Sequence, residues 1–286
     1  MNKVLAIDLD GTLFYPKSRK RLVSKKNVEF LQRFIDLGNK VVLVTSRAAE
    51  FVERVVKEIG REVDYLACTG AVIKINNEIV EKTSVQNKVM KTVIDDTIMT
   101  FKPLAILLTT EKYEMIVHAL FPFGRFLKAM YQFWYKVAFG VSRQPIELSN
   151  NVFEDELNGG NIYGAKIFFG LRSKQEKMNK EINKSVRERF KDDIEASWAG
   201  QVIELTPVGC DKANAIKKYA NLTNTNHDNI YVIGDSGNDI SMFNEFHDNS
   251  FVMAHSYPSV KKYAKHEISR VYKIEKYVLG KESNNE

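Results

Sequence analysis

The chain begins with the stretch Val4-Leu5-Ala6-Ile7-Asp8-Leu9-Asp10-Gly11-Thr12, in which an apolar run ends on two carboxylates, a glycine and a hydroxyl. A short run of consecutive apolar residues predicts a strand buried on both faces, as in a parallel sheet. In open α/β sheets, ligands bind outside the carboxyl ends of the strands. We therefore expect Asp8 and Asp10 to lie at a ligand-binding edge of a sheet.

Two further apolar runs repeat this arrangement. Residues 41–44 end on Thr45-Ser46-Arg47, and residues 65–68 end on Thr69-Gly70. Amphipathic helical spacing lies between the successive runs. Alternating strands and helices predict an α/β fold with a doubly wound parallel sheet, because right-handed crossovers bring the strand ends to one edge.

The same rhythm returns in the last third of the chain. Asp211 is expected to cap a helix that starts at Lys212. Residues 230–233 form another buried strand, which ends on Gly234-Asp235-Ser236-Gly237-Asn238-Asp239, and a further strand over 251–253 ends near His255. The C-terminal third should therefore return to the sheet begun by the first strand.

Between these two α/β parts the pattern changes to hairpins and longer helices, which predicts an inserted α+β domain. We expect the core to comprise residues 1–83 and 200–286, and the insert residues 84–199. A helix expected over 125–139 carries an aromatic stripe. That stripe fits the packed face of a small domain better than a substrate pocket or a membrane surface.

Composition narrows the function classes. A chain of 286 residues with 44% apolar residues can bury a sizeable core. The net charge is +6, and the basic residues are spread along the chain and mixed with 36 acidic ones. That balance indicates an anionic ligand or no particular partner, and it disfavours a nucleic-acid groove. The basic cluster over residues 17–26 fits a solvated loop or a positive rim near the site.

Neither membrane nor disulfide chemistry is expected. No uncharged stretch approaches the roughly 20 residues that a spanning helix needs. Cys68 and Cys210 stand far apart without C-x-x-C spacing, so a disulfide framework or a zinc site is not supported. We expect a cytoplasmic protein with reduced thiols.

The polar strand ends carry a consistent chemistry. Asp8, Asp10 and Asp235 offer carboxylate oxygens without histidine or cysteine beside them, a donor set that suits Mg²⁺. A divalent ion also removes much of the repulsion between a carboxylate nucleophile and a phosphate dianion. The cluster predicts Mg²⁺-assisted phosphoryl transfer.

Within such a site the residues would have different roles. Asp8 is expected to attack phosphorus and form an aspartyl-phosphate, and Asp10 to act as general acid and then general base. Asp239 is expected to orient the water ligands of the metal. The groups expected to hold the transferring phosphoryl group are Thr45, Lys212 and the backbone amides near Leu9 and Ser46. Each motif alone also fits a turn or a helix cap, but their combination favours one site.

Together these motifs resemble those of a haloacid dehalogenase superfamily phosphatase of the Cof type. In that group a large α+β cap is inserted between the second and third motifs. The matching residues are Asp8-Leu9-Asp10-Gly11-Thr12 for the first motif, Thr45 for the second, Lys212 for the third, and Gly234-Asp235 with Asn238-Asp239 for the fourth.

The resemblance implies Mg²⁺-dependent hydrolysis of a small phosphorylated metabolite. It implies that Asp8, Asp235 and the backbone carbonyl of Asp10 are metal ligands. It also implies a contact from Ser236 to metal-bound water, and phosphate or substrate contacts near Arg47 and from Asn238.

Three positions depart from the family pattern. Ser46 stands where glycine is usual, which is harmless if only its amide is used. Thr69 and His255 each stand where asparagine is usual, so these changes bear on substrate contacts and not on phosphoryl chemistry. His255 fits either a substrate ligand or proton donor, or a surface-loop histidine.

Two other functions are compatible with the sequence. A phosphosugar mutase uses the same core and passes the phosphoryl group to a sugar hydroxyl instead of water. A binding or regulatory module could keep the scaffold without catalysis, but the retention of Asp10 and Lys212 disfavours it. Substrate identity and oligomeric state are left open by the sequence.

Overall fold

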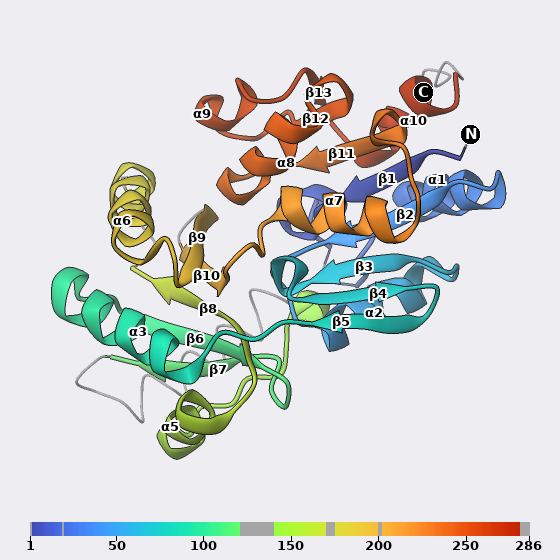
Figure 1. Ribbon diagram of the computed structural model, residues 1–286. Helices are drawn as coiled ribbons and strands as arrows, with labels where there is room; N and C mark the ends of the chain where they lie inside the picture. Colours follow the sequence, from blue (N-terminus) through green and yellow to red (C-terminus); the bar gives the residue numbers. More distant parts are fainter. Residues whose placement is uncertain (1, 19, 121–139, 170–174, 200–201, 281–286) are drawn as a thin grey trace.

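The computed structural model describes residues 2–18, 20–120, 140–169, 175–199 and 202–280 (Figure 1). Within these residues the chain forms two sheets. The larger sheet has the order β13-β12-β11-β1-β2-β3-β4-β5, is parallel from β13 to β3, and ends in the antiparallel hairpin of β4 and β5. Its strands are β1 (Val4–Ile7), β2 (Lys40–Val44), β3 (Asp64–Ala67), β4 (Val72–Ile75), β5 (Glu78–Lys82), β11 (Ile230–Gly234), β12 (Ser250–Met253) and β13 (His266–Ile268).

Helices cover both faces of this sheet, because alternate residues of its buried strands point to opposite sides. In β1, Leu5 and Ile7 pack with α1 (Lys25–Asp36) and α2 (Ala49–Ile59). Val4 and Ala6 belong to the other hydrophobic cluster, with α7 (Lys212–Leu222) and α8 (Ile240–Glu245). The short helices α9 (Pro258–Lys261) and α10 (Glu275–Val278) lie near the end of the chain. The predicted doubly wound α/β core is confirmed.

The inserted segment forms the second sheet, which is antiparallel and has the order β7-β6-β8-β10-β9. Figure 1 shows its helices on the side away from the larger sheet. The strands are β6 (Ala105–Thr110), β7 (Ile116–Ala119), β8 (Ile162–Phe168), β9 (Ile194–Ala199) and β10 (Val202–Pro207), and the helices are α3 (Asn87–Phe101), α5 (Asn150–Gly159) and α6 (Gln175–Phe190).

The second sheet extends beyond residue 200, where the sequence predicts the return to the core. β10 pairs with both β8 and β9, so the second sheet continues to Pro207. The apolar run of β10 looks the same whether it pairs with the core or with the insert, and only the sheet topology distinguishes these. We therefore propose an insert over residues 84–207.

Some predicted elements lie outside the described residues. The aromatic helix expected over 125–139 is one of them, and the described residues contain α5, which the sequence reasoning did not predict. None of the helices within the described ranges is long and apolar enough to cross a bilayer.

Candidate active site

The larger sheet gathers the polar strand ends at one edge. β1 lies between β11 and β2, so Asp8, Thr45 and Asp235, each of which follows one of these strands, become neighbours. The amide of Asp8 donates to the carbonyl of Ile233 at 3.0 Å, which aligns the ends of β1 and β11. Residues more than two hundred positions apart in sequence thus face one another, as expected for the carboxyl edge of a parallel sheet.

Lys212 is the buried cation of this edge. Asp211 caps α7 by accepting from the amides of Ala213 and Asn214, and thereby sets the start of the helix beside Asp8. The Lys212 ammonium is fully buried and donates to Asp8 Oδ1 at 2.6 Å and to Asp239 Oδ1 at 2.5 Å. A buried ammonium shared by two carboxylates holds both in one orientation.

Three carboxylates form an acidic cluster around this cation. Asp8, Asp235 and Asp239 each place an oxygen within 4.8 Å of the others. Asp239 Oδ2 accepts from the amides of Asp235 at 2.8 Å and Ser236 at 2.9 Å, so Asp239 orders the loop after β11. Asp8 Oδ2 is buried and has no hydrogen-bond partner among the described residues. Such an orphaned oxygen calls for a ligand or an ion.

Gly11 makes room for Asp235 in this cluster. Its φ of 84° is in the left-handed region, and a Cβ there would lie 2.3 Å from Asp235 Oδ2. Asp235 Oδ1 accepts from Thr12 Oγ1 at 3.2 Å. Glycine is therefore required both for the turn after β1 and for the approach of the loop after β11.

Asp10 is held by Arg47 at the rim of the site. Arg47 Nε lies 2.5 Å from Asp10 Oδ2, and Nη2 lies 2.6 Å from Oδ1. The buried guanidinium also stacks on Phe51, with its central carbon 4.0 Å from the ring centre. Burial raises the pKa of Asp10, but Arg47, with smaller contributions from Lys166 and Lys17, more than offsets this, so the net pKa is below its ordinary value and the carboxylate is ionised.

The remaining predicted phosphate contacts lie close to this rim. Thr45 Oγ1 is buried and accepts from the amide of Arg47 at 3.2 Å. Leu9 is buried in the turn between Asp8 and Asp10. Ser46 Oγ accepts from Lys166 Nζ at 2.9 Å, and Ser236 Oγ donates to Asn238 Oδ1 at 2.8 Å.

Two residues of the insert reach this edge and were missed by the sequence reasoning. Lys166 of β8 contacts Ser46, and Glu204 of β10 accepts from Asn238 Nδ2 at 2.9 Å. Each is the single charged residue of its strand, which is the signal that could have found it. The sequence reasoning placed the chemistry in the core and left the insert side of the site unspecified.

Two of the three positions that depart from the family pattern, Thr69 and His255, also line the site. Thr69 is buried with a φ of 58°, and its Oγ1 has no hydrogen-bond partner among the described residues. His255 stacks on Tyr15 with ring centres 3.9 Å apart, and its Nε2 lies 3.9 Å from Asp235 Oδ2. Burial and the nearby Arg270 lower the pKa of His255.

Nearly the whole chain matches one enzyme family. A profile of haloacid dehalogenase-like hydrolases matches residues 5–273. The chain belongs to the haloacid dehalogenase-like hydrolase family. The predicted family, the α/β fold class and the assignment as an enzyme, a hydrolase of this superfamily, are therefore confirmed.

Named relatives of this haloacid dehalogenase-like hydrolase include phosphatases. This chain is 26% identical to 5-amino-6-(5-phospho-D-ribitylamino)uracil phosphatase YwtE of Bacillus subtilis over 268 residues, and the alignment covers 84% of each chain. The fold matches that of SMU.1108c from Streptococcus mutans with a TM-score of 0.77, 17% identity and coverage of 98% and 100% of the two chains. The HAD subclass IIB sugar phosphatase BT4131 matches with a TM-score of 0.70, 18% identity and coverage of 96% and 98%.

The acidic cluster of this hydrolase is electrostatically incomplete without a cation. Burial raises the pKa of Asp8 to about 7, with the nearby Asp239 adding to the rise and Lys212 opposing it. Burial raises the pKa of Asp235 to about 9, and the charges of Asp8 and Asp239 add to this. One ammonium does not balance three carboxylates, so the residues present fit a divalent cation.

We predict that Mg²⁺ stabilises the protein more at high pH than at low pH. Because the folded pKa values of Asp8 and Asp235 lie above the ordinary 3.8, their favourable contribution is complete below about pH 4. That contribution is lost as pH rises through about 7 and about 9. Saturating Mg²⁺ should raise the melting temperature at about pH 8.5 by several degrees more than at about pH 5.

Thermal unfolding with MgCl₂ and with EDTA measures this difference. The Asp235→Asn variant removes one carboxylate and should lose most of the Mg²⁺-dependent shift. The exposed Asp248→Asn variant is the matched control and should keep it. An equal Mg²⁺ shift at both pH values would contradict the prediction.

Proposed function

We propose that the chain is a Mg²⁺-dependent phosphatase that hydrolyses a small phosphorylated metabolite through an aspartyl-phosphate on Asp8. The observation that carries this proposal is Asp8 itself. One of its oxygens is fixed by Lys212 at 2.6 Å, and the other is buried without a partner among the described residues. A carboxylate that is oriented on one side and unsatisfied on the other is suited to attack an electrophile.

The metal would be held by Asp8, Asp235 and the backbone carbonyl of Asp10, with Ser236 and Asp239 orienting its water ligands. When bound, Mg²⁺ supplies positive charge that reduces repulsion between Asp8 and a phosphate dianion. Asp239 already uses both carboxylate oxygens on Lys212 and on backbone amides, which suits an orienting role.

In the first step Asp8 attacks phosphorus and the bond to the leaving oxygen breaks. Asp10 delivers a proton to that oxygen and then takes one from the water that hydrolyses the aspartyl-phosphate. The pair with Arg47 keeps Asp10 ionised before substrate binds. An anionic substrate competes for the guanidinium, which weakens its hold on Asp10 and lets the carboxylate gain a proton.

The phosphoryl oxygens would be bound by groups that follow β1, β2 and β11 and by the first residue of α7. The side chains assigned to this task are those of Thr45, Arg47, Asn238 and Lys212, together with the backbone amides near Leu9 and Ser46. We propose a cytoplasmic location on the basis of Cys68 and Cys210, which are free and buried.

A panel of phosphate esters tests the proposal. Purified protein with Mg²⁺ should release inorganic phosphate from sugar or alditol phosphates, and EDTA should stop the release. YwtE is a phosphatase of a phosphoribitylamino compound, so ribitol and ribose phosphates belong in the panel. The absence of phosphate release from every ester would overturn the proposal. Conversion of one sugar phosphate into its isomer without phosphate release would instead identify a mutase.

A further inference from the structure

Lys166 and Glu204 form a charged pair on the face of the insert that looks toward the active site. They stand directly opposite each other in the register of β8 and β10. Their strand neighbours Ile167 and Ile203 point the other way, into the cluster shared with the insert helices. Opposite residues of an antiparallel pair have Cβ atoms about 5 Å apart, so the two side chains act as one unit.

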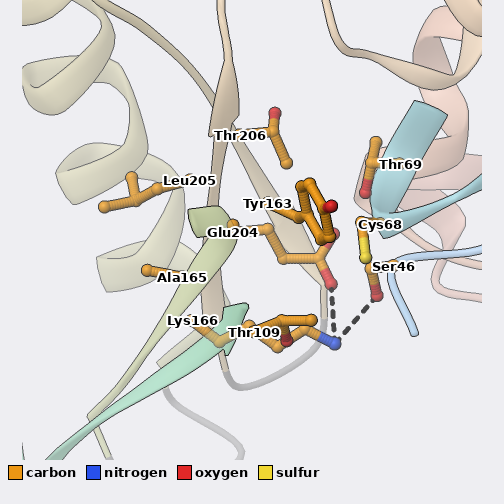
Figure 2. Close-up of a pocket in the computed structure, with 11 residues that line it drawn as sticks. Ser46, Cys68, Thr69, Thr109, Tyr163, Ala165, Lys166, Glu204, Leu205 and Thr206 are labelled. Carbon is orange, nitrogen blue, oxygen red and sulfur yellow. Dashed lines mark hydrogen bonds and ion pairs between the residues drawn. The ribbon is translucent and has the colours of Figure 1, made fainter. Parts of the chain in front are cut away.

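This pair contacts the core at two residues assigned to phosphate or substrate. Lys166 Nζ lies 2.9 Å from Ser46 Oγ and 3.5 Å from Glu204 Oε1. Figure 2 marks both contacts with dashed lines. Glu204 is 2% exposed, and its Oε2 accepts from Asn238 Nδ2 at 2.9 Å. A buried carboxylate this close to a phosphate site is unfavourable for binding an anion unless it has a task of its own.

Thr69 adds a third polar group to the same pocket. Its hydroxyl is buried, lacks a hydrogen-bond partner among the described residues, and lies across the pocket from Lys166 and Glu204 in Figure 2. Three successive residues with positive φ, Cys68, Thr69 and Gly70, hold it there. A β-branched residue in the left-handed region is strained, and such strain commonly accompanies a functional site.

We propose that Lys166 and Glu204 bind two neighbouring hydroxyl groups of a polyhydroxylated leaving group, such as a sugar or an alditol. Glu204 accepts a hydrogen bond from one hydroxyl, Lys166 donates to the next, and Thr69 offers a further contact. The pair is suited to a diol because it combines an obligate acceptor with an obligate donor at close spacing. This inference rests on the proposed phosphatase function, because the leaving group must lie between Asp8 and the insert.

In the structure this pair occupies the place of the leaving group. The cavity between Ser46, Thr69, Lys166 and Glu204 has a volume of about 10 Å³, enough for one water molecule. A cleft of about 320 Å³ adjoins it at Cys68 and Tyr163 and offers space for the rest of a larger leaving group. Substrate binding therefore exchanges the contacts to Ser46 and Asn238 for contacts to substrate hydroxyls.

Matched substrate pairs test this recognition. Each alditol phosphate, namely glycerol 3-phosphate, ribitol 5-phosphate and sorbitol 6-phosphate, is compared with the n-alkyl phosphate of the same carbon number. The wild-type enzyme should prefer at least one alditol ester by about 100-fold or more in kcat/KM, because a buried polar site rejects analogues that lack its partner. Lys166→Met and Glu204→Gln should each reduce kcat/KM for that ester by about 10- to 100-fold.

The alkyl phosphates report on folding and on the phosphoryl chemistry. An effect of the variants through Ser46 or Asn238 would change both members of a pair equally, so the ratio of kcat/KM for the alditol ester to that for the alkyl ester should fall by about 10-fold or more. Glu204→Gln keeps an oxygen that accepts from Asn238. Glu195→Gln, on the neighbouring strand β9, is the matched control and should leave the preference for the alditol ester unchanged. No wild-type preference for any alditol ester, or equal losses on both members of a pair, would overturn the inference while leaving the phosphatase intact. If wild-type enzyme hydrolyses neither member of any pair, the proposed function fails and the inference fails with it.

Discussion

Asp8→Asn is expected to abolish turnover while leaving the protein folded. Asparagine keeps the size of the side chain and an oxygen for Lys212, but it cannot form the acyl phosphate. We expect a loss of about 10⁴-fold or more in kcat, as for other covalent nucleophiles. Phosphate release from the best ester of the panel measures the loss.

Stability separates this effect from unfolding. The buried Asp8 carries a pKa of about 7 because of burial and of repulsion from Asp239, so a neutral amide relieves an unfavourable charge. Without Mg²⁺ the melting temperature of Asp8→Asn should equal or exceed that of the wild type at about pH 8. Asp248→Asn, at an exposed position, is the matched control and should keep full activity. Residual turnover above about 1% of wild type would contradict a nucleophilic role for Asp8.

Lys212→Met is expected to cost both stability and activity. The ammonium is fully buried between Asp8 and Asp239, and its removal leaves two carboxylates facing each other. Breaking a buried ion pair by removing one partner destabilises a protein by about 3–5 kcal/mol. The loss should be smaller at about pH 5 than at about pH 8, because burial raises the pKa of Asp8 and this carboxyl group can take up a proton and become neutral at the lower pH.

Denaturant unfolding without metal, at the two pH values, measures this loss. Lys217→Met on the same helix is the matched control, because its ammonium lies 3.3 Å from Glu245 at a half-exposed position. We expect a change within about 0.5 kcal/mol there. A similar small change for Lys212→Met, or a loss that does not depend on pH, would show that Lys212 is not the balancing charge of the cluster.

Much of the core site was predictable because its signals are local. Asp8, Thr45 and Asp235 each stand directly after a buried strand. The alternation of strands and helices brings the ends of these strands to one edge of the sheet. Lys212 could be placed because Asp211 caps the helix that starts there. These inferences needed only the period of the hydrophobic pattern and the rules of chain crossover.

The insert side was not predictable in the same way. The contact between Ser46 and Lys166 spans 120 residues, and that between Glu204 and Asn238 joins β10 of the second sheet to the turn that follows β11 of the first. The bidentate pair of Arg47 with Asp10 likewise depends on side-chain directions that a spacing pattern does not contain. The same limitation explains the boundary at residue 200, since β10 could pair with either sheet on its pattern alone.

The opening stretch and its partner motifs thus hold the residues of the proposed chemistry, because a strand that stops on Asp8 and Asp10 places them at a sheet edge in any fold of this class. The contacts around those residues depend on packing between segments that are distant in the sequence. Lys166 and Glu204 become part of the candidate site only because the second sheet packs against the first. This packing brings Lys166 into contact with Ser46 and Glu204 into contact with Asn238. Contacts of this kind depend on the relative position of two sheets, a quantity that no local pattern of residues encodes.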